Sequence, residues 1–130
     1  MDKPIQVNSD ITVLPSHLPL PIPGHGYVGI NAFVLKSQQP VLVDTGMGIE
    51  ADEYMSALES IIDPSEIQWI WITHDDADHI GNLEEVLARA PKAKIITNII
   101  GVARMETFWN IKLDMVHLVN PGETLDVGDR

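Results

Sequence analysis

Five side chains of types that bind metal ions stand within six consecutive positions: His74, Asp75, Asp76, Asp78 and His79. They directly follow residues 67–73, an apolar run that predicts a buried strand. Side chains of an extended chain alternate with a period of two, so His74 and Asp76 would point to the same side and could share one metal ion. Asp78 and His79 are adjacent, and they converge on a second ion only where the chain turns, for which Gly81 provides a signal. The spacing therefore predicts a dinuclear metal site.

The alternative is a solvated acidic loop that caps the following helix, with both histidines incidental. Three carboxylates within four positions repel one another unless cations or hydrogen bonds compensate, which favours the metal site. Asp75 alternates to the side opposite Asp76, so we expect it to be a surface carboxylate or a group that supports the loop without touching the metal.

The composition limits the kinds of site and partner that the chain can have. No cysteine is present, which excludes disulfides, thiolate nucleophiles and cysteine-bound metal, so any metal must rest on histidine and carboxylate ligands. Nineteen acidic residues against eight basic ones give a net charge of −11, and we therefore expect neither nucleic acid nor a membrane as a partner. No apolar run approaches the roughly 18 residues of a membrane helix, and no leader sequence is visible. We expect a cytoplasmic protein.

The elements before the cluster can be predicted from patterning. Residues 1–26 hold closely spaced prolines that end in Gly24-His25-Gly26, which predicts an extended arm or surface loop. Residues 27–36 and 41–43 predict a β-hairpin, and 51–62 predict a helix with one apolar stripe. The strand over 67–73 is expected to be covered on both faces, with Trp69 and Trp71 in the core.

Strands and helices alternate after the cluster as well. We expect Asn82 to cap a helix that Pro91 ends, and Asn98 to cap a helix that runs to about Trp109. Strands are predicted over 94–97 and 115–119, and 125–128 begins another. This alternation predicts an α/β layered architecture, and 130 residues make one domain.

The pattern His74-x-Asp76-x-Asp78-His79, followed by Ile80-Gly81-Asn82, resembles the signature of the metallo-β-lactamase fold. Asn31 in the strand after a glycine-rich loop and the run Val41-Leu42-Val43-Asp44-Thr45-Gly46 resemble that family's opening hairpin. The resemblance covers most of residues 24–128. It implies that the chain is the N-terminal half of an αββα sandwich, a mixed sheet with helices on one face.

The resemblance also gives Asp44 a role. A carboxylate beside a glycine turn commonly satisfies backbone donors, so a turn-former is one interpretation. In the family the matching Asp supports the metal loop from outside the coordination sphere and orients a ligand, and we favour that role.

The family implies two divalent metal ions, iron, zinc or manganese, with His74 and Asp76 on the first and Asp78 and His79 on the second. In most of its hydrolases the third signature position is His, whereas Asp76 is a carboxylate as in the flavodiiron branch, where Glu is usual. An oxygen ligand moves the preference from zinc toward iron or manganese.

Three functions follow from the resemblance. The main expectation is a hydrolase of a small-molecule substrate, in which a metal-bridging hydroxide attacks and Asp78 also orients the nucleophile as the catalytic residue. The first alternative is a diiron protein that reacts with oxygen or nitric oxide and needs an electron-transfer partner. The second is a non-catalytic half-domain that acts through assembly.

The family's remaining ligands lie in a second half, so residues 1–130 resemble a truncated domain. We therefore expect an exposed apolar face, homo-oligomerisation and little activity of the chain by itself. His117 could supply a missing ligand, although its position within a predicted strand favours a structural role. His25 could line the mouth of the pocket.

Overall fold

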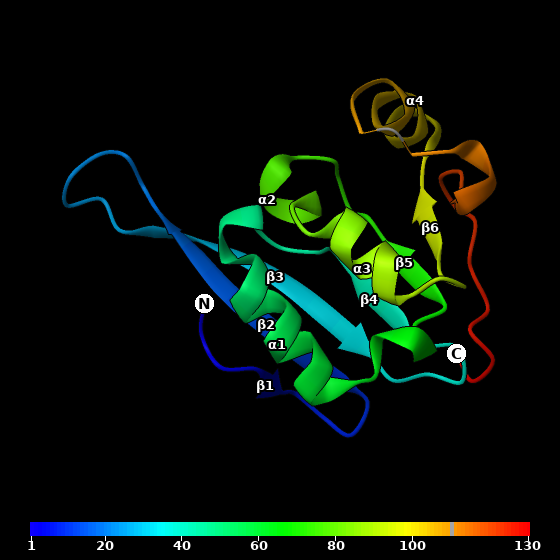
Figure 1. Cartoon of the computed structure of the whole chain (residues 1–130), viewed down its shortest axis with the longest axis horizontal. Coiled ribbons are helices and arrows are strands. Elements are labelled where there is room, and N and C mark those ends of the chain that lie inside the picture. Colours follow the sequence, from blue (N-terminus) through cyan, green and yellow to red (C-terminus); the bar gives the residue numbers. More distant parts are fainter. Residues whose placement is uncertain (110) are drawn as a thin grey trace.

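The computed structural model describes residues 1–109 and 111–130, which form a mixed sheet with the strand order β1-β2-β3-β4-β5-β6-β7 (Figure 1). The first part of the sheet is antiparallel and the second part continues parallel to β4. The strands are β1 (Ile5–Gln6), β2 (Ile11–Pro19), β3 (Tyr27–Leu35), β4 (Val41–Val43), β5 (Trp69–Trp71), β6 (Lys94–Thr97) and β7 (Val116–Leu118).

Helices connect the parallel strands. They are α1 (Ala51–Ile61), α2 (Ala77–Ile80), α3 (Leu83–Arg89) and α4 (Ile99–Phe108), with 3₁₀ turns η1 (Gly48–Glu50), η2 (Pro64–Glu66) and η3 (Leu113–Met115). The predicted hairpin is present as β3 and β4, and the predicted cap of α4 forms because Asn98 accepts a hydrogen bond from the amide of Gly101 at 2.9 Å. The mixed α/β architecture is confirmed.

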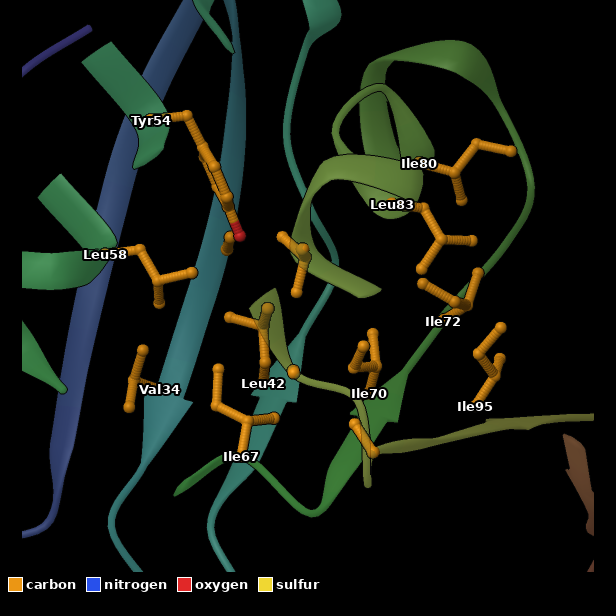
Figure 2. Close-up of a cluster of buried hydrophobic side chains, with 14 of the residues drawn as sticks. Val34, Leu42, Tyr54, Leu58, Ile67, Ile70, Ile72, Ile80, Leu83 and Ile95 are labelled. Carbon is orange, nitrogen blue, oxygen red and sulfur yellow. The ribbon is translucent and has the colours of Figure 1, made fainter. Parts of the chain in front are cut away.

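The core lies between one face of the sheet and the helices α1 and α3. Leu42, Ile70 and Ile95 come from three neighbouring strands and are fully buried. Figure 2 shows them together with Leu58 of α1 and Leu83 of α3. Because the alternate residues of each strand point to this face, the apolar runs of β4, β5 and β6 all contribute to one core.

The opposite face of the sheet is only partly covered. Trp71 is 49% exposed and Trp69 is half-buried, so the expectation that this strand is covered on both faces, with both tryptophans in the core, is wrong. The C-terminal residues cross this face and leave an apolar cavity of about 360 Å³, lined among others by Trp71, Leu35 and Val127. The tryptophans alternate with Ile70 and Ile72, which the helices bury, and therefore point to the uncovered side.

The N-terminal residues differ from their prediction. An arm or loop over residues 1–26 is wrong for Ile11–Pro19, which form β2 and pair with β3 along their whole length. Residues 20–26 form the turn between β2 and β3, which projects from the body of the molecule (Figure 1). Proline fits because β1 pairs only with Thr12 and Val13, so Pro15 and Pro19 lie where β2 is an edge strand.

The C-terminal residues also differ from their prediction, because residues 125–128 do not form the expected strand. The carbonyl of Val127 accepts a hydrogen bond from the amide of Gln39 at 2.9 Å, and the Val127 side chain is buried. Among the described helices, none is long and apolar enough to cross a membrane.

Candidate metal centre

The ligand loop, residues 73–79, leaves the end of β5 and enters the single-turn helix α2. His74 Nε2 lies 3.6 Å from Asp76 Oδ2, and His79 Nε2 lies 3.8 Å from Asp78 Oδ2. The two imidazole rings are 3.9 Å apart between centroids. The fold therefore brings together all four residues for which the sequence predicts metal binding, as two imidazole–carboxylate pairs side by side.

Asp44 directly follows β4 and forms hydrogen bonds with this loop. Its carboxylate is 5% exposed and accepts hydrogen bonds from the Thr73 amide at 2.9 Å, from the Thr73 hydroxyl at 2.7 Å and from His79 Nδ1 at 2.8 Å. The backbone of Asp44 has φ 58°, in the left-handed region that Asp and Asn enter more readily than most residues. The carboxylate thus bonds to the ligand loop rather than to its own turn.

The bond to Asp44 sets the hydrogen position on His79. A carboxylate only accepts, so Nδ1 of His79 carries the hydrogen and Nε2 of the neutral ring keeps its lone pair. Nε2 lies 3.8 Å from the Asp78 carboxylate, and a cation between these two acceptors would satisfy both of them. This arrangement is the one a metal-binding imidazole has when a carboxylate orients it from behind.

The end of α2 packs closely against the loop that follows β4. The Gly81 amide donates to the Gly46 carbonyl at 2.9 Å, and a Cβ at Gly81 would lie 2.2 Å from the Gly48 nitrogen. Asn82 is buried, and its side-chain amide donates to the carbonyls of Thr45 and Met47. Asn82 occupies the predicted N-cap position of α3, but its side chain does not bond to the first turn of the helix, because the loop after β4 takes the side-chain amide instead.

Asp75 bonds to a helix beside the ligand loop. Its side chain is 11% exposed and forms an ion pair with Arg104 of α4. The hydrogen bond that Arg104 donates to the Asp75 carboxylate raises the pKa of the guanidinium, and the charge of Asp76 acts in the same direction. Sequence reasoning missed Arg104, since a single arginine on a helix gives no signal of a partner 29 positions away.

The two other candidate histidines lie elsewhere. His117 is in β7, and its ring contacts the edge of Trp69 at 5.5 Å between centroids. His25 lies in the turn between β2 and β3, where its amide donates to the Ile22 carbonyl. Among the described residues, no hydrogen bond or ring contact joins either histidine to the ligand loop.

The donor atoms fit a pair of hard or borderline metal ions. Two donors that share an ion at about 2.0–2.2 Å are roughly 3.0–3.5 Å apart, so distances of 3.6 and 3.8 Å need only a small side-chain movement to close. Among the described residues, no group of three or more histidine and carboxylate side chains is arranged to hold one ion. The loop would thus offer two donors to each of two ions, where a full coordination sphere takes four or more.

Comparisons with known proteins show the family of the chain. A family model described as the metallo-beta-lactamase superfamily matches residues 25–129. The flavo-diiron protein FprA2 of Clostridium acetobutylicum is 34% identical over 99 residues, which are 76% of this chain and 25% of that protein. The rubredoxin-oxygen oxidoreductase of Megalodesulfovibrio gigas is 31% identical over 112 residues, which are 82% of this chain and 28% of that protein.

Solved structures have the same fold. A flavoprotein of Thermotoga maritima superposes with a TM-score of 0.79 at 30% identity over 93% of this chain and 32% of that one. The chain spans about a quarter of the curated relatives' length and about a third of the solved chain's length. The chain belongs to the metallo-beta-lactamase superfamily, in its flavodiiron-type branch.

Proposed function

We propose that this chain contributes four ligands to a dinuclear iron centre that reduces dioxygen or nitric oxide with electrons from a partner. The observation that carries the proposal is Asp76, whose carboxylate lies 3.6 Å from Nε2 of His74. An oxygen donor at this position moves the preference from zinc toward iron or manganese. Similarity to proteins named flavo-diiron protein and rubredoxin-oxygen oxidoreductase supports iron.

The hydrolase that the sequence led us to expect has less support. The relatives carry names of flavo-diiron proteins and oxidoreductases, and hydrolysis, zinc and a hydroxide nucleophile rest on the wider family alone. We therefore place the diiron function first.

The chain's own residues have separate parts in this proposal. Two ferrous ions, when bound, would supply electrons and open positions for a small diatomic ligand. His74 and Asp76 hold one ion, and Asp78 and His79 hold the other. Asp78 is also the catalytic candidate, because a third of its side chain is exposed and can accept a hydrogen bond from water beside the substrate.

The electrons must come from outside the ligand loop. No cysteine is present, so the chain has no ligand for an iron–sulfur donor of its own. The relatives named flavo-diiron protein and flavorubredoxin suggest a flavin or rubredoxin-type donor on a partner or on another part of the protein. The further donors that each ion needs would come from a second polypeptide segment or from a second copy of the chain. The location that we propose is the cytoplasm.

The experiment is metal competition followed by gas exposure. The chain is refolded anaerobically with equal ferrous iron, manganese and zinc, and bound metal is counted for the wild type and for Asp76→His. We expect iron or manganese to predominate in the wild type and zinc in Asp76→His, because only the donor type at this position changes.

The ferrous wild type should then give a nitrosyl signal in electron paramagnetic resonance when nitric oxide is added. His74→Ala is the control, because it removes one imidazole from the first ion. Zinc alone in the wild type, with ester or phosphodiester hydrolysis that His74→Ala abolishes, would overturn the diiron proposal and support the hydrolase.

A further inference from the structure

Thr73 stands immediately before the four candidate ligands. We propose that Thr73 is a positioning residue whose hydroxyl transmits the orienting effect of Asp44 to His74, so that one buried carboxylate aligns both imidazoles. This inference rests on the proposed metal centre, but not on which reaction the centre performs.

The directions of the hydrogen bonds carry the first step. Thr73 Oγ1 lies 2.7 Å from Asp44 Oδ2 and 3.0 Å from His74 Nδ1. A carboxylate only accepts, so the single hydroxyl hydrogen of Thr73 goes to Asp44. The hydroxyl oxygen can then only accept from His74, which places the imidazole hydrogen on Nδ1.

The second step follows from that tautomer. With its hydrogen on Nδ1, His74 keeps the Nε2 lone pair, and Nε2 is the atom that faces Asp76 at 3.6 Å. His79 has the same tautomer without an intermediate hydroxyl, because its Nδ1 donates to the same oxygen of Asp44 at 2.8 Å. Its Nε2 lies beside Asp78. Asp44 Oδ2 therefore orients His79 by direct contact and His74 through the Thr73 hydroxyl.

The third step concerns why this position needs a hydroxyl. His74 is 49% exposed, whereas His79 is 18% exposed, so packing restrains the His74 ring less. The backbone amide of Thr73 also donates to Asp44, at 2.9 Å, which holds the threonine itself in place. The hydroxyl is thus a fixed acceptor for a ligand that packing restrains less, and serine can supply the same atom.

The test compares Thr73→Val with Thr73→Ser in the full chain. Valine keeps the β-branched shape and the backbone bond but removes the hydroxyl, and serine keeps the hydroxyl. Histidine tautomers are read from ¹⁵N chemical shifts of the metal-free protein at about pH 8, above the ordinary imidazole pKa. We expect the Nδ1–H form of His74 in the wild type and in Thr73→Ser, a shift toward Nε2–H in Thr73→Val, and an unchanged His79 in all three.

The second readout is binding of Mn²⁺ alone, counted by electron paramagnetic resonance. Thr73→Val should weaken one of the two binding steps about 10- to 100-fold, as the loss of an outer partner of a ligand does elsewhere, and Thr73→Ser should restore it. An unchanged His74 tautomer in Thr73→Val, an altered tautomer with unchanged Mn²⁺ affinity, or failure of serine to restore binding would each overturn the proposal.

Both readouts are independent of redox activity. A wild-type protein that shows the predicted tautomers and binds Mn²⁺ but does not react with nitric oxide would contradict the proposed function and leave the role of Thr73 intact.

Discussion

Oδ2 of Asp44 lies 2.8 Å from Nδ1 of His79, and 35 positions of sequence separate the two residues. Strands β4 and β5 are parallel neighbours, so their carboxyl ends meet at the same edge of the sheet. The loop after β4 supplies the carboxylate, and the loop after β5 supplies the candidate metal ligands. The ligand loop is therefore oriented by a rigid part of the fold rather than by its own backbone alone.

Asp44→Asn tests this relationship with little backbone perturbation, because Asn also tolerates the positive φ of this position. The amide retains only one oxygen for the three donors from Thr73 and His79. We expect a loss of about 1–3 kcal/mol in the free energy of unfolding. Metal affinity should fall about 10- to 100-fold.

Urea unfolding and metal titration check the two effects separately. Metal affinity equal to that of the wild type, with or without a loss of stability, would show that Asp44 does not orient the imidazoles.

The junction at Gly81 gives a second prediction, which concerns space rather than backbone conformation. Gly81 has φ −58°, which any residue adopts, but a Cβ there would lie 2.2 Å from the Gly48 nitrogen and 2.7 Å from the Gly46 oxygen. Gly81→Ala should therefore separate the two loops and destabilise the protein by more than about 2 kcal/mol.

Gly29→Ala is the matched control, since the nearest atom to a Cβ at this position is the side-chain nitrogen Nδ2 of Asn31 at 3.9 Å. Thermal unfolding of both variants checks the difference. Equal midpoints for Gly81→Ala and Gly29→Ala would contradict the packing argument.

These features differ in how far the sequence could predict them. The ligand spacing from His74 to His79 and the strand before it are local, so a period of two and one turn signal were enough to predict that four side chains converge. The ion pair of Asp75 with Arg104, the bonds of the Asn82 side chain to the loop after β4 and the strand β2 all depend on partners far along the chain. The exposure of Trp71 depends on which layers are present, which an apolar run does not reveal.

A third prediction concerns alkaline pH. Tyr54 is buried, and its hydroxyl donates to the Asp44 carbonyl at 3.1 Å. Burial, and then the nearby charge of Asp44, raise the pKa of Tyr54 well above its ordinary value. The unfolded chain loses this proton near pH 10 while the folded chain keeps it, so the stabilisation is fully present below about pH 10 and is lost as the pH rises above it.

Tyr54→Phe should therefore cost about 1 kcal/mol near neutral pH, because the Asp44 carbonyl loses a donor. The same variant should lose less stability than the wild type between about pH 8 and pH 11. Urea midpoints at the two pH values check this, and Tyr27→Phe is the control because Tyr27 is exposed. A parallel pH dependence in the wild type and Tyr54→Phe would contradict the assignment.

The last prediction concerns the face of the sheet that the C-terminal residues cover only in part. Trp71 and Trp69 of β5 share this face with Val41 and Val43 of β4 and with Phe33 of β3, by the registers of the three strands. An apolar surface of this kind favours association, whereas the net charge of −11 on each chain opposes it. Because salt screens the repulsion and leaves apolar burial in place, we expect the chain to self-associate more strongly as the salt concentration rises.

Trp71→Ser should weaken this association at every salt concentration, since it removes the largest exposed side chain of the face. Phe108→Ser is the matched control, because Phe108 is 70% exposed but lies on α4. Sedimentation velocity at low and high salt measures both variants against the wild type. A wild-type chain that stays monomeric at high salt, or a Phe108→Ser variant that dissociates as much as Trp71→Ser, would show that the sheet face does not drive assembly.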